Sequence, residues 1–337
     1  MLIKLNAICT ALYVKAGAAV LLSGAGAPDM LLLIGGIVLI AAGLVLIFLS
    51  VFGFKKDGPA LKFSQKKNVP VQEYKPESPQ TASSRLMVNA ESLIGDRPYQ
   101  QDYCRFASGL SPELQAEKGT LCIVCDGMGG LQGGERASRL CCETVFNGYY
   151  DSPATEDVCS LLKQLIISAD KGVARLTGDD GQPINGGTTI VAVVIRGEKA
   201  YWASAGDSRI YLYLNGNLSQ ITQDHNYRMI LMQDVKAGKI PPEAVEQHPQ
   251  KEALISYVGK GNISLIDTGV FKFAPEDGTL ILCSDGLYKY ANPSQITGIA
   301  GQYASQPDQT ASALAYFAAG NLNVRHDNIT VMTACRQ

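Results

Sequence analysis

The chain lacks a marked excess of charge and has very few histidines. Its 337 residues contain 29 lysines and arginines against 31 aspartates and glutamates, a net charge of −2. This balance gives no reason to expect nucleic acid as a partner, so any phosphate chemistry has to be local. Only three histidines are present, and none stands at motif spacing from Ser208 or Ser284. Acyl-enzyme chemistry on a serine is therefore disfavoured, and we expect structural roles for His225, His248 and His326.

The sequence also lacks the cysteine spacing of a disulfide scaffold. Nine cysteines are scattered along the chain, several of them inside apolar runs. This usage predicts reduced, buried thiols and a cytosolic domain. Cys122 and Cys125 form a C-x-x-C pair, but residues three apart on a strand point to opposite faces. We therefore expect neither a disulfide nor a metal site at this pair.

Charge is absent altogether from residues 30–54. A helix of about 20 apolar residues spans the hydrocarbon core of a bilayer, so this segment can cross a membrane. Residues 5–27 are also apolar but contain Asn6 and Lys15. A two-helix hairpin, an interfacial first helix and a cleavable signal peptide are all compatible with that pattern. We predict a membrane segment over residues 1–56, in the form of a two-helix hairpin, with its strongest span at 30–54.

The charge around this segment indicates its orientation. The expected outer turn carries only Asp29, whereas five lysines follow the span: Lys55, Lys56, Lys62, Lys66 and Lys67. Positive charge tends to stay on the cytoplasmic side, so the rest of the chain is placed in the cytoplasm. Residues 57–85 combine scattered prolines with Lys, Gln, Ser and Glu and have no apolar period, which is typical of a flexible linker.

Residues 86–337 alternate short β-rich runs with helical blocks. Strands are predicted at 120–125, 188–195, 200–205, 210–214, 279–283 and 329–334. Asn215-Gly216 is a strong hairpin signal, which makes the middle of the domain an antiparallel meander. Apolar residues recurring at three and four predict helices at 135–149 and 155–176, with further helices at 227–236, 250–258 and 308–320.

Four of the expected strands have an aspartate at one end, namely Asp126, Asp207, Asp285 and Asp327. Core packing does not require this feature. If the fold gathers these ends, the carboxylates share one rim and need cations to separate them. Ligand sets made only of oxygen suit Mg²⁺ or Mn²⁺ rather than zinc. The residues alone thus predict a two-metal hydrolase, in which the ions activate a shared water.

Several motifs resemble, in order, those of the metal-dependent type 2C serine/threonine protein phosphatases in a bacterial-like form. They are Gly95-Asp96-Arg97-Pro98-Tyr99-Gln100-Gln101-Asp102, Val124-Cys125-Asp126-Gly127-Met128-Gly129-Gly130, Glu135-Arg136-Ala137-Ser138, Gly187-Thr188-Thr189, Ala205-Gly206-Asp207-Ser208-Arg209, Gln223-Asp224-His225, Cys283-Ser284-Asp285-Gly286-Leu287 and Asp327-Asn328-Ile329-Thr330. The resemblance implies an α+β fold: a β-sandwich of two mostly antiparallel sheets flanked by helix pairs, with the metal site at one end of the sandwich. To this fold the sequence adds the N-terminal transmembrane helical segment.

The resemblance also assigns metal ligands. Asp126 would bridge two Mg²⁺ or Mn²⁺ ions, and the carbonyl of Gly127 would bind the first of them. Asp285 and Asp327 would complete the ligand set of the second ion. Asp207 is similar to the family's ligand for a third, more weakly held ion, which it would share with Asp285.

Two further residues receive catalytic roles beside Asp126. Arg97 would clamp the substrate phosphate with its guanidinium fork, and Asp102 would orient the attacking water. The sequence departs from the family at Met128, where many eukaryotic members have a histidine thought to protonate the leaving group. A thioether cannot donate a proton, so no general acid is assigned. Gln100-Gln101 replaces the more usual Asn followed by Glu or Gln, which leaves open the water shell of the second ion.

The implied function is hydrolysis of phosphoserine and phosphothreonine on proteins by a metal-activated water at a binuclear centre. Residues 227–262 would form a flap beside the active site. Expected partners are phosphorylated proteins, an opposing serine/threonine kinase and the bacterial inner or plasma membrane, with no nucleic acid. One alternative is a catalytically silent phosphatase-like domain that senses or docks a partner at the membrane. Another is a metallohydrolase acting on small phosphoesters.

Overall fold

The computed structural model describes residues 86–130, 133–178, 181–274, 278–304, 306–320 and 324–336. The expected membrane segment, residues 1–56, and the expected linker, residues 57–85, lie outside the described residues. Among the residues that are described, no helix combines the length and the apolar character needed to cross a bilayer. The described part of the chain holds all the acidic motifs.

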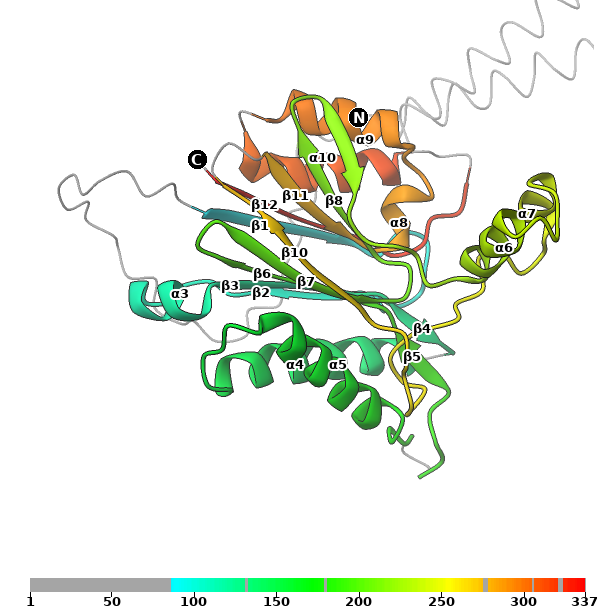
Figure 1. Ribbon diagram of the computed structural model, residues 1–337, viewed down its shortest axis with the longest axis horizontal. Coiled ribbons are helices and arrows are strands. Elements are labelled where there is room, and N and C mark those ends of the chain that lie inside the picture. The colour runs from blue at the N-terminus through cyan, green and yellow to red at the C-terminus, as the bar shows by residue number, and fades with distance from the viewer. Residues whose placement is uncertain are drawn as a thin grey trace, which may run out of the picture. The chain divides into compact units, whose positions relative to one another are not determined.

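The domain is a sandwich of two five-stranded sheets (Figure 1). The first sheet has the order β1 (Leu86–Leu93), β12 (Ile329–Arg336), β11 (Thr279–Cys283), β8 (Arg209–Leu214) and β9 (Asn217–Gln220). The second has the order β10 (Asp267–Lys272), β7 (Lys199–Ala205), β6 (Ile190–Arg196), β3 (Thr120–Cys125) and β2 (Tyr103–Phe106). All neighbouring strands are antiparallel. A small separate sheet pairs β4 (Gly127–Gly129) with β5 (Gly186–Thr188).

Helix pairs flank the sandwich on both sides, as predicted (Figure 1). The pair α4 (Gly133–Asp151) and α5 (Val158–Val173) packs against the second sheet. The pair α9 (Pro293–Gln302) and α10 (Pro307–Ala319) packs against the first. The remaining helices are short: α3 (Pro112–Lys118), α6 (Tyr227–Lys236), α7 (Glu243–Gln247) and α8 (Asp285–Tyr288). The α+β sandwich expected from the sequence is therefore confirmed.

Strand β3 is buried along its whole length because both of its faces are covered. Leu121, Ile123 and Cys125 face α4 and α5, whereas Cys122 and Val124 face the first sheet. Each fully buried aliphatic side chain contributes about 1.5 to 3 kcal/mol to stability. The two cysteines of the C-x-x-C pair point to opposite faces, as predicted. All eight cysteines in the described part of the chain are free thiols.

The predicted hairpin is present, whereas one predicted helix is wrong. Asn215 and Gly216 adopt positive φ angles of 49° and 80° and connect β8 to β9. Residues 250–258 contain no helix. Their backbone pairs with another segment instead: the Ile255 N–H donates to the His225 carbonyl (2.9 Å). Contacts between segments have replaced the hydrogen bonds that a helix would make within itself.

Candidate metal centre

Strand ends gather the four predicted aspartates at one end of the sandwich. Asp126 follows β3, Asp207 lies between β7 and β8, Asp285 begins α8 after β11, and Asp327 precedes β12. In the first sheet the start of β8, the end of β11 and the start of β12 are neighbours. The antiparallel register thus brings together residues that lie far apart in the sequence.

The carboxylates are close enough to raise one another's pKa. Burial raises the pKa of Asp126 well above its ordinary value, and the charges of Asp102, Asp285, Asp207 and Asp327 raise it further. Burial also raises the pKa of Asp102 to about 7. Burial and the charge of Asp285 raise the pKa of Asp207 to about 6. At neutral pH such a cluster needs cations to hold its charge together.

Two carboxylate oxygens in this cluster are buried without a hydrogen-bond partner, Asp102 Oδ1 and Asp285 Oδ1. Buried oxygens of this kind are the ligands that hard divalent ions prefer. Within the described ranges, no three His, Cys, Asp or Glu side chains already form a closed ligand group. Instead, Asp285 forms an ion pair with Lys289, and Asp327 forms one with Arg97. The oxygen-only donor set nevertheless fits Mg²⁺ or Mn²⁺.

The backbone around Asp126 is fixed by the β4–β5 sheet. The Asp126 N–H donates to Thr189 Oγ1 (3.1 Å), and Thr188 Oγ1 donates to the Asp126 carbonyl (2.9 Å). A Cβ at Gly127 would collide with the carbonyl oxygen of Gly134. Only glycine therefore fits at this position, which explains the Asp-Gly sequence at the end of β3.

Asp102 is held by a residue for which sequence reasoning found no role. Ser284 Oγ donates to Asp102 Oδ2 (2.8 Å) although the two residues are 182 positions apart. The Thr330 N–H in turn donates to Ser284 Oγ (2.9 Å). Ser284 therefore orients Asp102 and leaves Oδ1 free. Its only signal in the sequence is its place immediately before Asp285.

Arg97 lies beside the acidic cluster, as the resemblance implied. Its Nη2 is 2.6 Å from Asp327 Oδ2, and 47% of its side chain is exposed. Asn328 fixes the loop that carries Arg97, because its Nδ2 donates to the carbonyls of Ile94 (2.8 Å) and Tyr99 (3.0 Å). A cleft of about 340 Å³ opens here and is lined by Arg97, Tyr290, Arg325, His326 and Asp327.

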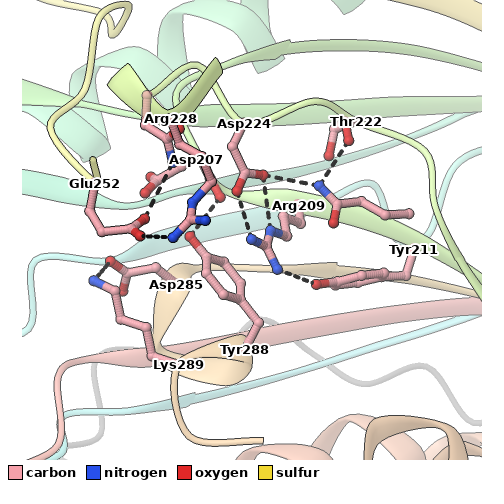
Figure 2. Close-up of polar contacts among 12 residues, drawn as sticks. Asp207, Arg209, Tyr211, Thr222, Asp224, Arg228, Glu252, Asp285, Tyr288 and Lys289 are labelled. Atoms are coloured by element: carbon pink, nitrogen blue, oxygen red, sulfur yellow. Dashed lines mark hydrogen bonds and ion pairs between the residues drawn. The ribbon is translucent and has the colours of Figure 1, made fainter. Parts of the chain in front are cut away.

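The turn that carries Asp207 is braced from the side of α8 (Figure 2). The hydroxyl of Tyr288 donates to the Asp207 carbonyl (3.0 Å). Arg209 lies 3.5 Å over the Tyr288 ring. It also makes a two-pronged pair with Asp224, through Nε (2.9 Å) and Nη2 (2.6 Å). Asp207 therefore sits on a rigid support.

The three histidines have structural roles. His225 is fully buried, and its Nδ1 accepts a hydrogen bond from the Gly206 N–H (3.3 Å). The backbone N–H of His326 donates to Asp96 Oδ2 (2.8 Å), and its ring Nδ1 lies 3.3 Å from the same oxygen. His248 Nδ1 accepts from the backbone N–H two residues later (3.2 Å). All three use their polar groups to fix turns.

The predicted flap contains α6 and α7, which extend away from the sandwich (Figure 1). Arg228 joins the parts of this flap by pairing with Glu246 and with Glu252 (2.9 Å). Asp170 on α5 anchors the far side of the flap, because its carboxylate accepts from the N–H groups of Gly259 (2.7 Å), Gly261 (3.0 Å) and Ile263 (2.9 Å). No pattern in the sequence marked Asp170, because an acidic residue in a helix is usually exposed.

Comparisons of sequence give the same family in each case. A family model for protein phosphatase 2C matches residues 105–229. The serine/threonine phosphatase stp of Listeria welshimeri is 31% identical over 214 residues, which is 62% of this chain and 82% of that protein. Protein phosphatase PhpP of Streptococcus pneumoniae is 31% identical over 216 residues, which is 63% of this chain and 84% of that protein.

Solved structures are also similar to this chain. The serine/threonine phosphatase of S. agalactiae superposes with a TM-score of 0.62 at 26% identity, covering 75% of this chain and 100% of that one. The catalytic domain of the serine/threonine protein phosphatase PstP, in complex with 2 manganese ions, superposes with a TM-score of 0.57 at 26% identity. That match covers 74% of this chain and 98% of the other.

Proposed function

Because this chain belongs to the protein phosphatase 2C family, it is a metal-dependent serine/threonine protein phosphatase, and we propose that Asp126, Asp285 and Asp327 hold its two divalent ions. Mg²⁺ or Mn²⁺ is the cofactor. The carbonyl of Gly127 would add a further oxygen ligand. The observation that carries this assignment is the gathering of mutually repelling carboxylates, two of them with orphaned buried oxygens, at one end of the sandwich.

The side chains around the ions then have separate tasks. Bound divalent ions would lower the pKa of the attacking water and neutralise charge on the phosphoryl group. Asp102 orients that water through Oδ1, since Ser284 occupies its other oxygen. Met128 lies on β4, and its thioether cannot donate a proton, so we assign no general acid.

Arg97 binds the phosphoryl group of the substrate. Its guanidinium now pairs with Asp327, yet nearly half of the side chain is exposed beside the cleft. An arriving phosphate dianion offers the same guanidinium two oxygens in a plane, which favours a bidentate pair over the single contact to Asp327.

The test is turnover of phosphoserine and phosphothreonine peptides by the full-length chain, with Mn²⁺ and with a chelator. We expect turnover only with the metal. Arg97→Lys should lower kcat/KM by about 10- to 100-fold, because a lysine cannot reproduce the forked pair and loses roughly 1.5 to 3 kcal/mol of charge-assisted hydrogen bonding. Arg139→Lys is the matched control, because Arg139 is exposed on α4 and packs on the Tyr103 ring.

The same assay separates the alternatives. A silent docking domain would release no phosphate from any substrate. A hydrolase of small phosphoesters would cleave p-nitrophenyl phosphate and ignore the peptides. Equal losses in the Arg97 and Arg139 variants would contradict the role given to Arg97.

We further propose that residues 1–56 anchor the enzyme in a bacterial inner or plasma membrane, with the catalytic domain in the cytoplasm. The uncharged stretch at 30–54 and the lysines that follow it support this placement. Residues 57–85 would act as the tether. Attachment would raise the local concentration of the enzyme near membrane-bound substrates and near an opposing serine/threonine kinase.

Membrane attachment predicts the behaviour of the full-length chain in its native cells. The protein should stay with membranes after washing at alkaline pH, and protease added outside intact spheroplasts should not cut residues 86–337. Recovery of the chain in the wash would contradict the anchor, and digestion of the catalytic domain would contradict the orientation.

A further inference from the structure

A lysine lies within the acidic cluster itself. Lys289 follows α8 directly, one helical turn after Asp285, and its Nζ donates to Asp285 Oδ2. The two side chains are 43% and 14% exposed. Figure 2 shows the Lys289 ammonium against Asp285, on the same side of the site as Asp207 and Tyr288.

The charge of Lys289 acts on more than its direct partner. Burial alone would lower the pKa of Lys289, yet the carboxylates of Asp285, Asp207 and Asp126 together raise it. At Asp207, where burial and Asp285 raise the pKa, Lys289 opposes them. One ammonium therefore compensates charge on several carboxylates at once.

The lysine is held in place by the segment that carries it. Its direct partner Asp285 stands four residues earlier, a spacing at which side chains on a helical turn meet. The neighbouring Tyr288 is fixed to the Asp207 carbonyl (3.0 Å) and is covered by Arg209. The ammonium thus belongs to the same short, braced turn as Asp285, the carboxylate that it contacts directly.

Arg97, at the other side of the cluster, does not share a segment with its aspartate partner. It comes from a loop 230 residues away from its partner Asp327. A substrate phosphate can draw Arg97 away. Lys289 remains next to Asp285 because both belong to one turn.

We propose that Lys289 is a built-in cation on the Asp207–Asp285 side of the acidic cluster, which excludes a third divalent ion there and limits the chain to two. The inference rests on the proposed function, because it presupposes the two ions at Asp126. It gives Asp207 a role different from the one that the family resemblance implied: Asp207 balances Lys289 instead of holding a metal. Lys289 occupies Asp285 Oδ2 and leaves Asp285 Oδ1 to one of the two ions. A third divalent ion bound between Asp207 and Asp285 Oδ2 would lie next to the ammonium, and that repulsion opposes its uptake.

The test counts Mn²⁺ bound to the purified full-length chain by titration calorimetry and by the electron paramagnetic resonance signal of free Mn²⁺. The wild type should bind about two ions per chain. Lys289→Met removes the ammonium and keeps an unbranched side chain that is one atom shorter, so it should bind about three ions, the added one more weakly. Lys289→Arg keeps the charge and should still bind about two.

Lys239→Met is the matched control. Lys239 also pairs with an aspartate (Asp234, 2.9 Å), but on the flap and with 69% of its side chain exposed. Its loss should leave the number of bound ions unchanged. A wild-type chain that binds three ions overturns the proposal whether or not the variants fold. An unchanged count in a folded Lys289→Met variant, verified by circular dichroism, overturns it as well. If no variant, nor the wild type, binds Mn²⁺ tightly, it is the proposed function that fails.

Discussion

Replacement of Asp126 by asparagine is expected to lower phosphopeptide turnover by about 10³-fold, a loss comparable to removing a principal charge-stabilising group from an active site. Asp126 is the carboxylate on whose pKa all four neighbouring aspartates act, so it lies at the centre of the cluster. An amide is a weaker ligand and carries no charge to balance two divalent cations. The measurement is kcat with saturating Mn²⁺, together with the number of Mn²⁺ ions bound.

The same substitution should stabilise the chain when no metal is present. The raised pKa of Asp126 means that burial and its neighbours oppose the ionised form, and asparagine removes that unfavourable charge. The midpoint of thermal unfolding with a chelator should therefore rise. Asp234→Asn on α6 is the control, because Asp234 pairs with a lysine outside the cluster, and it should change neither property.

This opposite effect on activity and stability separates loss of a ligand from misfolding. A variant that is inactive only because it unfolds would show a lower midpoint with the chelator. Turnover close to that of the wild type in Asp126→Asn would refute the metal-ligand role of this residue.

The second large effect concerns the stability of the metal-free chain as a function of pH. Burial raises the folded-state pKa of Asp102 to about 7, and burial with Asp285 raises that of Asp207 to about 6. An unfolded aspartate titrates near about 3.9. Between these values the folded state binds more protons than the unfolded state, so stability is lost as the pH rises from about 4 to about 7.

Divalent ions should reverse this loss. At pH 7.5, Mn²⁺ at about 100 times its dissociation constant adds about 2.7 kcal/mol per site, which corresponds to a rise of roughly 5 to 10 °C in the unfolding midpoint. At pH 5 protons compete for the same oxygens, so the rise should be much smaller. Calorimetric scans at both pH values, with Mn²⁺ and with a chelator, measure the difference. Equal rises at pH 5 and pH 7.5 would show that the ions bind elsewhere.

Much of the architecture could be predicted because it depends on local pattern. Apolar runs of strand length located β3, β7, β8 and β11 within a residue or so. The aspartates were found because each adjoins such a run. The Asp-Gly pair at Gly127 could be recognised because only glycine lets the backbone pass so close to the neighbouring Gly134 carbonyl. Local signals failed where the backbone bonds to a distant segment. Residues 250–258 have a helical pattern of apolar residues, but their backbone forms hydrogen bonds with the stretch around His225 instead of a helix.

The sequence by itself determined which oxygen ligands the protein possesses, since strand ends with aspartates can be read without knowing what they touch, and their hard-ion chemistry follows from composition alone. Only the tertiary structure decided which groups surround those ligands. Ser284 meets Asp102, Asp170 meets the flap, and the charge of Lys289 acts on Asp207. Of these contacts the first two span 182 and 89 residues. Such contacts form because the two sheets pack on one core. That packing depends on all the buried side chains together, so no single position in the sequence predicts it.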